Sequence, residues 1–349
     1  MKNKTLQPQI SVCIPVYKTE PYLAQCLNTV FHQNFDSFEI VIVSDASPGR
    51  DSQGWKAKKI IRHAQKEGNA WRCKQGLSKI KVNFSEHIEN RGILEVRRSL
   101  TYEAKGQYCF HLDSDDALTP DALSQVWRAN TEQGPFDIVH AGAYSGTFDD
   151  SGNFISAAES KSGPVTYGKL EGHEIFHKWL YHEISGYVWP KLIRRELYIR
   201  AFEIIPYSQC GFADDFLIFF YISLFAQSYI GLENKIHYYR IDSGMTASKA
   251  ITSLERWKTV CSTSTVFTVI SQWLQENPSE SQSITSDELS KIKEQGRLYL
   301  VSSHMQISNL VIPALQPQAY EMLCEYWGKD LVELADSQLK NHYNSRKSK

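Results

Sequence analysis

Two aspartates separated by one residue follow a short apolar segment in the first half of the chain. Asp113 and Asp115 come directly after Tyr108–Leu112, which predicts a buried strand. Side chains two apart in an extended chain point the same way, so both carboxylates would lie just past the strand's carboxyl end. Such a pair suits Mg²⁺ or Mn²⁺, which also take water and phosphate oxygens. An acidic turn in which Asp116 or Thr119 caps the next helix fits equally well.

Length and composition narrow the class of protein. The 349 residues suffice for one large domain or two ordinary ones, and 38 Lys and Arg balance 39 Asp and Glu, which argues against nucleic acid as a main partner. The seven cysteines are scattered, without the close pairs of a zinc site. The first nine residues lack a signal-peptide core, and no apolar run approaches the roughly 20 residues of a membrane span. We therefore expect a cytoplasmic protein.

Strand-like and helix-like segments alternate up to the paired aspartates. The β-prone runs are 10–15, 38–43, 80–84 and 108–112. The alternation predicts a Rossmann-like α/β fold, with a mostly parallel central sheet and helices on both faces. Right-handed crossovers put the carboxyl ends of parallel strands at one edge, so the intervening loops should meet there. These loops are 15–18, 44–50, 90–92 and 113–116.

The pattern changes after residue 140. Residues 141–167 are rich in Gly, Ser and Asp and predict hairpins, and the chain from 253 onward has helical spacing of its apolar residues. We expect a domain over 1–250 and a helical region over 251–349. An amphipathic helical tail could pair with a second copy, which leaves a homodimer open.

One segment of the first domain is markedly basic. It runs from Lys56 to Lys81, and Trp55 and Trp71 accompany it. A solvated helix face is the simpler interpretation. A surface near anionic phosphates or a membrane is the alternative.

Seven short motifs share an order that resembles the family 2 inverting glycosyltransferases of the GT-A fold. They are Ile14-Pro15-Val16-Tyr17, Val43-Ser44-Asp45-Ala46-Ser47, Asn90-Arg91-Gly92 followed by Arg97, Asp113-Ser114-Asp115, Trp189-Pro190-Lys191-Leu192-Ile193-Arg194-Arg195, Ala213-Asp214-Asp215, and Tyr238-Tyr239-Arg240 followed by Ser243 to Thr246. Each motif is weak alone, and their order over residues 10–250 makes the combination specific. The helical tail has no counterpart in this resemblance.

The resemblance implies a set of residues that bind a nucleotide sugar. They are Pro15, Val16, Tyr17, Glu20, Asp45, Ser47, Asn90, Arg97, Asp113, Ser114, Lys191, Asp214 and Arg240. Asp45 would accept the imide proton of uracil, although an Asx turn is an alternative. Tyr17 would present its ring edge to the base or lie in the core. Arg97 would lie near the diphosphate or pair with an aspartate.

The expected chemistry needs a metal and a base. Breaking a glycosyl phosphate bond leaves charge on the diphosphate, which a divalent ion held by Asp113 and Asp115 would stabilise. Inversion also requires a base that takes the proton of the acceptor hydroxyl. Asp215 is the candidate base, although Asp214 and Asp215 could simply be favourable acids in a helix's first turn.

Three further candidates have plain structural alternatives. His237 could be a third metal ligand or a core histidine. Lys191 could reach the donor or acceptor, or only extend its stem along apolar surface. Arg240 could clamp a phosphate or pair with Asp242.

The chain departs from the family's pattern at three places. Ser44-Asp45 stands where two aspartates are common, Arg97-Arg98 where an Arg-Asn pair is common, and Asp214 where glutamate is commoner. The first two remove polar contacts near the nucleotide and leave base and sugar preference open.

The implied function is metal-dependent, inverting transfer of a sugar from a nucleoside diphosphate, expected to be UDP, to a hydroxyl of a bacterial surface glycan. Lipopolysaccharide, capsule or exopolysaccharide would be the acceptor, and a lipid-linked acceptor would bring the protein peripherally to the inner membrane. A nucleotidyltransferase is an alternative, although Val16–Glu20 lacks its Gly-rich basic loop. A non-catalytic glycan-binding or assembly protein on the same fold is another.

Overall fold

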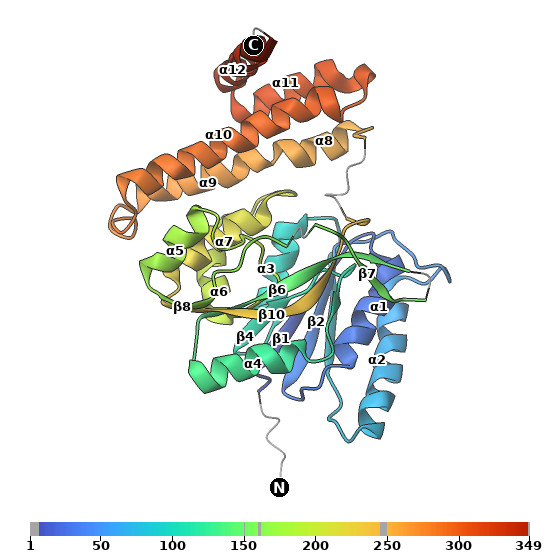
Figure 1. The fold of residues 1–349 in the computed structure, drawn as a ribbon. Coiled ribbons are helices and arrows are strands. Elements are labelled where there is room, and N and C mark those ends of the chain that lie inside the picture. The colour runs from blue at the N-terminus through green and yellow to red at the C-terminus, as the bar shows by residue number, and fades with distance from the viewer. Residues whose placement is uncertain (1–6, 150, 160–161, 245–249, 348–349) are drawn as a thin grey trace. The chain divides into compact units, whose positions relative to one another are not determined.

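The computed structural model describes residues 7–149, 151–159, 162–244 and 250–347. The chain forms two compact units. Unit 1 comprises Met1–Ile205 and Ile218–Ala247, and unit 2 comprises Pro206–Leu217 and Ser248–Lys349 (Figure 1). The segment 206–217, which the sequence assigned to the first domain, thus groups with the helices of unit 2.

The first half of unit 1 has the predicted alternation of strands and helices. Its elements are β1 (Ile10–Val16), α1 (Glu20–Phe31), β2 (Phe38–Ser44), α2 (Ala57–Lys74), β3 (Val82–Glu86), α3 (Ile93–Glu103) and β4 (Tyr108–His111). β1 pairs in parallel with both β2 and β4, and β2 with β3. The register aligns Val16 with Ser44, and Ser44 with Glu86, so these strands end together at one edge of the sheet.

The remainder of unit 1 completes a ten-stranded sheet. Its elements are β5 (Ala117–Leu118), α4 (Ala122–Gln133), β6 (Ile138–Phe148), β7 (Phe154–Ser156), β8 (Gly168–Glu171), α5 (His173–Leu180), β9 (Lys191–Arg194), α6 (Arg195–Ile204), α7 (Asp214–Phe225), which crosses into unit 1 from unit 2, and β10 (Ser228–Arg240). The main path of the sheet is β3-β2-β1-β4-β9-β6-β10-β5. β9 lies antiparallel between β4 and β6, and β6 is parallel to β10, so the sheet is mostly parallel as predicted.

Helices cover both faces of this sheet. All seven residues of β1 and all seven of β2 are buried, as expected for strands with helices above and below. Apolar residues of α1, α2 and α4 join one core cluster with the strands. α3 packs on β1 and β2 and against α6.

One expectation differs from the structure, in the stretch predicted to form hairpins. The helix that carries most of the basic segment, α2, is continuous to Lys74, and Gly68 lets it lie against the Phe31 ring of α1. The predicted hairpins over 141–167 reduce to β7 pairing with β6, because β6 runs to Phe148 as a single long strand beside β10.

Unit 2 is helical after residue 253, as predicted. It holds α8 (Leu254–Cys261), α9 (Thr263–Glu276), α10 (Ser286–Asn309), a short 3₁₀ turn (Pro313–Leu315), α11 (Gln316–Trp327) and α12 (Lys329–Lys347). Thr285 and Glu288 form a capping box at the start of α10. Among the described residues, no helix is long and apolar enough to cross a membrane.

Candidate functional site

The loops after β1, β2 and β4 are joined by hydrogen bonds at the carboxyl edge of the sheet. Ser114 donates its hydroxyl to the Pro15 carbonyl at 2.6 Å, and its Oγ lies 2.6 Å from the Thr19 hydroxyl. Lys18 donates its backbone N–H to the Ser47 hydroxyl at 2.8 Å. These bonds bring together loops from distant parts of the sequence, as the strand order predicted.

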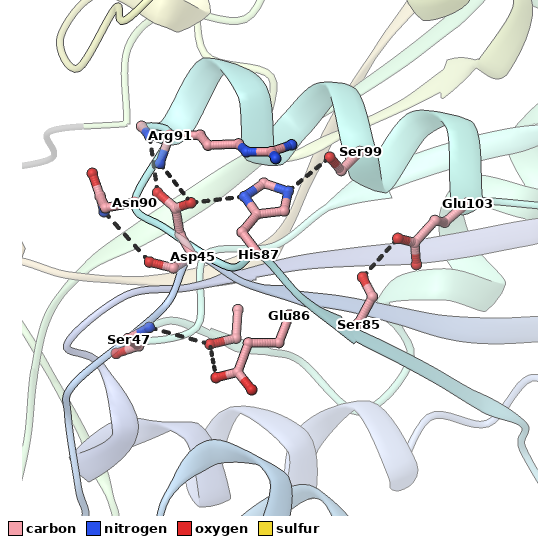
Figure 2. Close-up of polar contacts among 11 residues, drawn as sticks. Asp45, Ser47, Ser85, Glu86, His87, Asn90, Arg91, Ser99 and Glu103 are labelled. Carbon is pink, nitrogen blue, oxygen red and sulfur yellow. Dashed lines mark hydrogen bonds and ion pairs between the residues drawn. The ribbon is translucent and has the colours of Figure 1, made fainter.

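Asp45 fastens the loop after β2 to the start of α3. Its Oδ1 accepts the Arg91 N–H and its Oδ2 accepts the Gly92 N–H, both at 2.9 Å, and the side chain is buried (Figure 2). The Asn90 amide also contacts the Asp45 carbonyl at 3.5 Å. Gly92 has a φ of +87°, which only glycine adopts freely, and it permits this close approach.

His87 is a site residue that the sequence interpretation missed. Its Nδ1 lies 2.7 Å from Asp45 Oδ1, and its Nε2 lies 2.9 Å from the Ser99 hydroxyl of α3 (Figure 2). Asp45 is an acceptor, so Nδ1 donates to it, and Nε2 is left to hydrogen-bond the Ser99 hydroxyl. The place of His87 directly after the third strand is the only signal in the sequence that could have suggested it.

The predicted contact of Asp45 with a base remains compatible with this network. A carboxylate has four lone-pair sites. Oδ1 uses two of them for His87 and Arg91, and Oδ2 uses one for Gly92. These three donors leave one lone pair on Oδ2 free, so the contact with uracil stays a prediction. The carboxylate joins the loop after β2 to the loop before α3 instead of forming the Asx turn that was the alternative.

The two aspartates after β4 are held by different partners. Asp113 accepts from Arg97 at 3.3 Å, and 29% of its side chain is exposed. Asp115 accepts from the Ser243 hydroxyl at 2.8 Å. Burial, reinforced by the charges of Asp116 and Asp113, raises the pKa of Asp115 to about 7. A bound divalent cation would relieve this crowding of negative charge, so the donor set fits Mg²⁺ or Mn²⁺.

The third ligand is not assembled with them. Within the described residues, no three His, Cys, Asp or Glu side chains are grouped so that they could hold a metal ion. His237 instead directs Nε2 to Asp116 Oδ2 at 2.8 Å and stacks on Trp189, with ring centroids 4.9 Å apart. Burial lowers the pKa of His237 to about 4. The side chain therefore has the position of a core histidine whose Nδ1 is buried without a hydrogen-bond partner among the described residues, and a metal would rely on Asp113, Asp115 and oxygens of water and substrate.

The Arg240 side chain is buried and forms its hydrogen bonds with other residues of the fold. Its guanidinium donates to the Asp115 carbonyl at 2.9 Å and to Gln25 at 2.6 Å. It also lies 4.5 Å from the ring centroids of both Tyr22 and Phe148. The nearest oxygen of Asp242 is 3.8 Å away. These contacts favour a role in fixing the aspartate loop over direct binding of phosphate.

Lys191 is fully buried at the start of β9, which lies between β4 and β6 in the sheet. Its ammonium donates to the Ser185 hydroxyl at 2.9 Å and to the Tyr187 carbonyl at 2.5 Å. Neither the predicted contact with substrate nor the alternative of an extended surface stem describes this position. Its location instead supports an indirect role, because it anchors the segment that precedes β9.

The remaining predicted contacts lie in two settings. Tyr17 is 41% exposed at the end of β1, so its ring is available to a ligand rather than part of the core. Glu20 is buried in the first turn of α1, and neither of its carboxylate oxygens has a hydrogen-bond partner among the described residues. A Cβ on Gly49 would overlap the Glu20 carboxylate, so a larger residue there would have to displace that carboxylate.

The candidate base lies at the start of α7. Asp214 and Asp215 are the first two residues of the helix and group with unit 2. The preceding Ala213 has a φ of +62°, which is unusual for a residue with a Cβ. The catalytic assignment of Asp215 stays a prediction. Of the last motif, Ser243 is described, whereas Thr246 lies outside the described residues.

The fold and the carboxylate pair at its edge define a glycosyltransferase of the GT-A class. The chain belongs to glycosyl transferase family 2, whose model matches residues 11–202, more than half of the chain. The glycosyltransferase EpsH of Bacillus subtilis (strain 168) is 27% identical over 237 residues, which are 67% of this chain and 61% of EpsH. WcaA of Escherichia coli (strain K12), named as a colanic acid biosynthesis glycosyl transferase, is 25% identical over 160 residues, 46% of this chain and 49% of WcaA. The chain thus spans less than two thirds of either relative.

A solved structure shares the fold over nearly the whole chain. Residues 1–349 of S. aureus TarS in complex with UDP-GlcNAc align with a TM-score of 0.53 and 17% identity, covering 96% of this chain and 92% of that one. The likeness extends past the sheet into the helical region, where the sequence had suggested no relative.

Proposed function

We propose that this protein is a metal-dependent, inverting glycosyltransferase that transfers a sugar from a UDP-sugar to a hydroxyl of a bacterial surface glycan. Membership of family 2 supports sugar transfer. The UDP-GlcNAc bound by TarS and the colanic acid role in the name of WcaA favour the donor and the acceptor class. The observation that carries the proposal is the pair Asp113 and Asp115, held by Arg97 and Ser243 where three loops join.

In the donor site, the chain's own groups orient the diphosphate and the base. Asp113 and Asp115 would hold Mg²⁺ or Mn²⁺, which when bound supplies positive charge to the departing diphosphate. Arg97 keeps Asp113 in place and adds a cation beside it. Asp45 offers its remaining lone pair to the imide of uracil. Its backbone N–H donates to the Val16 carbonyl, which keeps it close to the exposed ring of the next residue, Tyr17.

At the acceptor, Asp215 is proposed to take the proton of the attacking hydroxyl as the new bond forms. Attack comes from the face opposite the diphosphate, so the anomeric configuration inverts and no covalent enzyme intermediate forms. The products are UDP and a glycan lengthened by one sugar.

Release of UDP tests this proposal directly. The full chain would be incubated with a panel of UDP-sugars and Mn²⁺, with parallel samples in EDTA and after Mn²⁺ is restored. We expect UDP from one donor, loss of release in EDTA and recovery on restoring the metal. Release that persists in EDTA would contradict metal dependence. Pyrophosphate formed from UTP would indicate a nucleotidyltransferase, and glycan binding without any release would indicate a non-catalytic module.

A further inference from the structure

The segment that contains α2 has a net positive charge, whereas the rest of the chain has a net negative charge. Between Lys56 and Lys81 there are nine Lys and Arg but one Glu, a net charge of +8 in a chain whose total is −1. The other residues together therefore carry −9. Such a separation of charge marks this segment as distinct from an ordinary mixed surface.

Packing separates the apolar and basic residues of the helix. Ala57, Ile60 and Ile61 are buried in the core cluster, and Gly68 lies against Phe31 of α1. The opposite side of α2 faces solvent on the outside of unit 1 (Figure 1). Because α2 has 18 residues, this side is about 27 Å long.

One of the nine cations belongs to the core. Arg72 is buried, and its guanidinium donates to Asp36 at 2.7 Å and to the backbone carbonyls of Phe31, Gln33, Phe35 and Ser78. Its charge is compensated inside the fold. The other eight are exposed: Lys56, Lys58, Lys59, Arg62, Lys66, Lys74, Lys79 and Lys81.

The spacing of the exposed cations works against the helix itself. Lys58, Arg62 and Lys66 follow each other at four-residue steps and so line one side of α2, where like charges destabilise a helix. In the described part of the chain, none of the three has an ion pair or a side-chain hydrogen bond. The Lys59 ammonium has only the Trp55 ring, 4.1 Å from its centroid. The row therefore lacks an internal partner.

We propose that this basic face docks on an anionic lipid bilayer. The face is long and formed by one helix, and Lys79 and Lys81 extend it toward β3 at the edge of the sheet. Seven of the eight cations are lysines, which act as point charges toward a dense anionic surface rather than as bidentate clamps for single phosphates. Clusters of four to eight such residues are of the size that binds anionic head groups electrostatically. This inference does not depend on the proposed donor or reaction.

Vesicle binding tests the inference with the full chain. Flotation would compare phosphatidylcholine vesicles with vesicles that contain about 30% phosphatidylglycerol, at about 0.05 M and about 0.5 M salt. The variant is the triple substitution Lys58→Gln, Arg62→Gln and Lys66→Gln. The matched control removes three exposed cations elsewhere, as Arg128→Gln, Lys293→Gln and Arg297→Gln.

We expect the wild type and the control to bind the anionic vesicles at low salt and to lose this binding at high salt. Neither should bind the neutral vesicles. The α2 variant should bind at least tenfold more weakly, since it lacks three cations and each Lys or Arg near an anionic surface adds to the binding free energy. Equal binding by the two triple variants, or no binding by the wild type, would overturn the inference. Binding to a soluble anionic polymer without binding to the anionic vesicles would likewise overturn it, and would identify a polymer as the partner. Circular dichroism of both variants checks that each is folded.

Discussion

At the scale of single residues, the site depends on carboxylates whose orientation is fixed by neighbours. The Asp45 carboxylate accepts from three donors, the Asp113 carboxylate accepts from Arg97, and the Asp115 carboxylate accepts from Ser243. His87 is the least expected of these neighbours, because it contacts Asp45 with one ring nitrogen and α3 with the other. Substitutions that preserve one nitrogen at a time can separate the two contacts.

The first prediction concerns His87. In His87→Asn the amide can replace Nδ1 and keep the bond to Asp45, whereas in His87→Gln the longer amide replaces Nε2 and keeps only the bond to Ser99. We expect UDP affinity by calorimetry to stay near the wild-type value for His87→Asn and to fall about tenfold for His87→Gln, the effect of one lost charge-assisted hydrogen bond. Equal affinities of the two variants would show that Asp45 does not need His87. Absence of UDP binding by the wild type would instead contradict the proposed donor.

The second prediction concerns the candidate base. Asp215→Asn keeps the size of the side chain and removes its basicity, so transfer to the acceptor should slow by at least about 100-fold while affinity for the donor is unchanged. Asp214→Asn at the neighbouring position is the matched control and should have a smaller effect. If both variants kept the wild-type rate of transfer, the base would have to be sought elsewhere.

At the scale of elements, buried polar chains join strands that the sequence places far apart. One such chain is formed by Lys191 of β9, Ser185, His140 of β6 and Tyr229 of β10, with His140 Nδ1 2.9 Å from the Tyr229 hydroxyl. Burial, followed by the charge of Lys191, holds the pKa of His140 well below its usual range.

The third prediction follows from the sign of that shift. Below a pH of about 6.5 the unfolded chain gains a proton on this histidine that the folded chain does not, so stability falls as the pH falls. His140→Gln should reduce the slope of unfolding free energy against pH by up to about 1.4 kcal/mol per pH unit between pH 6 and 5. Urea unfolding at several pH values measures it, with the exposed His63→Gln as control. An unchanged slope in His140→Gln would mean that this ring is protonated in the folded state.

The fourth prediction concerns the contact between α1 and α2. Alanine is favoured over glycine in a helix by about 1 kcal/mol, yet a Cβ at Gly68 would overlap the Phe31 ring. We expect Gly68→Ala to destabilise the protein by about 1–3 kcal/mol, because overpacking outweighs propensity. Ala70→Gly on the exposed side should cost only the propensity difference. A stabilised Gly68→Ala would show that the two helices can move apart at little cost.

At the scale of the whole molecule, the chain crosses between its compact units more than once. Phe216 groups with unit 2, where its ring lies 5.5 Å from that of Phe267 and 5.9 Å from that of Tyr299. Gly211 also donates its N–H to the Ser262 hydroxyl at 3.1 Å.

The fifth prediction is that a chain ended at residue 250 is not an independent domain. Truncation would remove the partners of 206–217 and expose apolar surface at Phe216, so the fragment should bind more of a hydrophobic dye and unfold at lower temperature than the full chain. A fragment as stable and as soluble as the full chain would support the division at 250 that the sequence suggests.

The sequence by itself determined the alternation of strands and helices, the shared edge of the sheet and the glycosyltransferase family, because these follow from local periodicity and from motifs in order. Tertiary structure alone decided which polar groups meet. Lys191 and Arg240 form hydrogen bonds within the fold, His237 pairs with Asp116, and His87 hydrogen-bonds Asp45. The reason is that a polar side chain near a sheet edge binds whichever partner the packing of distant segments brings within hydrogen-bond distance. The spacing of residues along the chain does not specify which distant groups come that close.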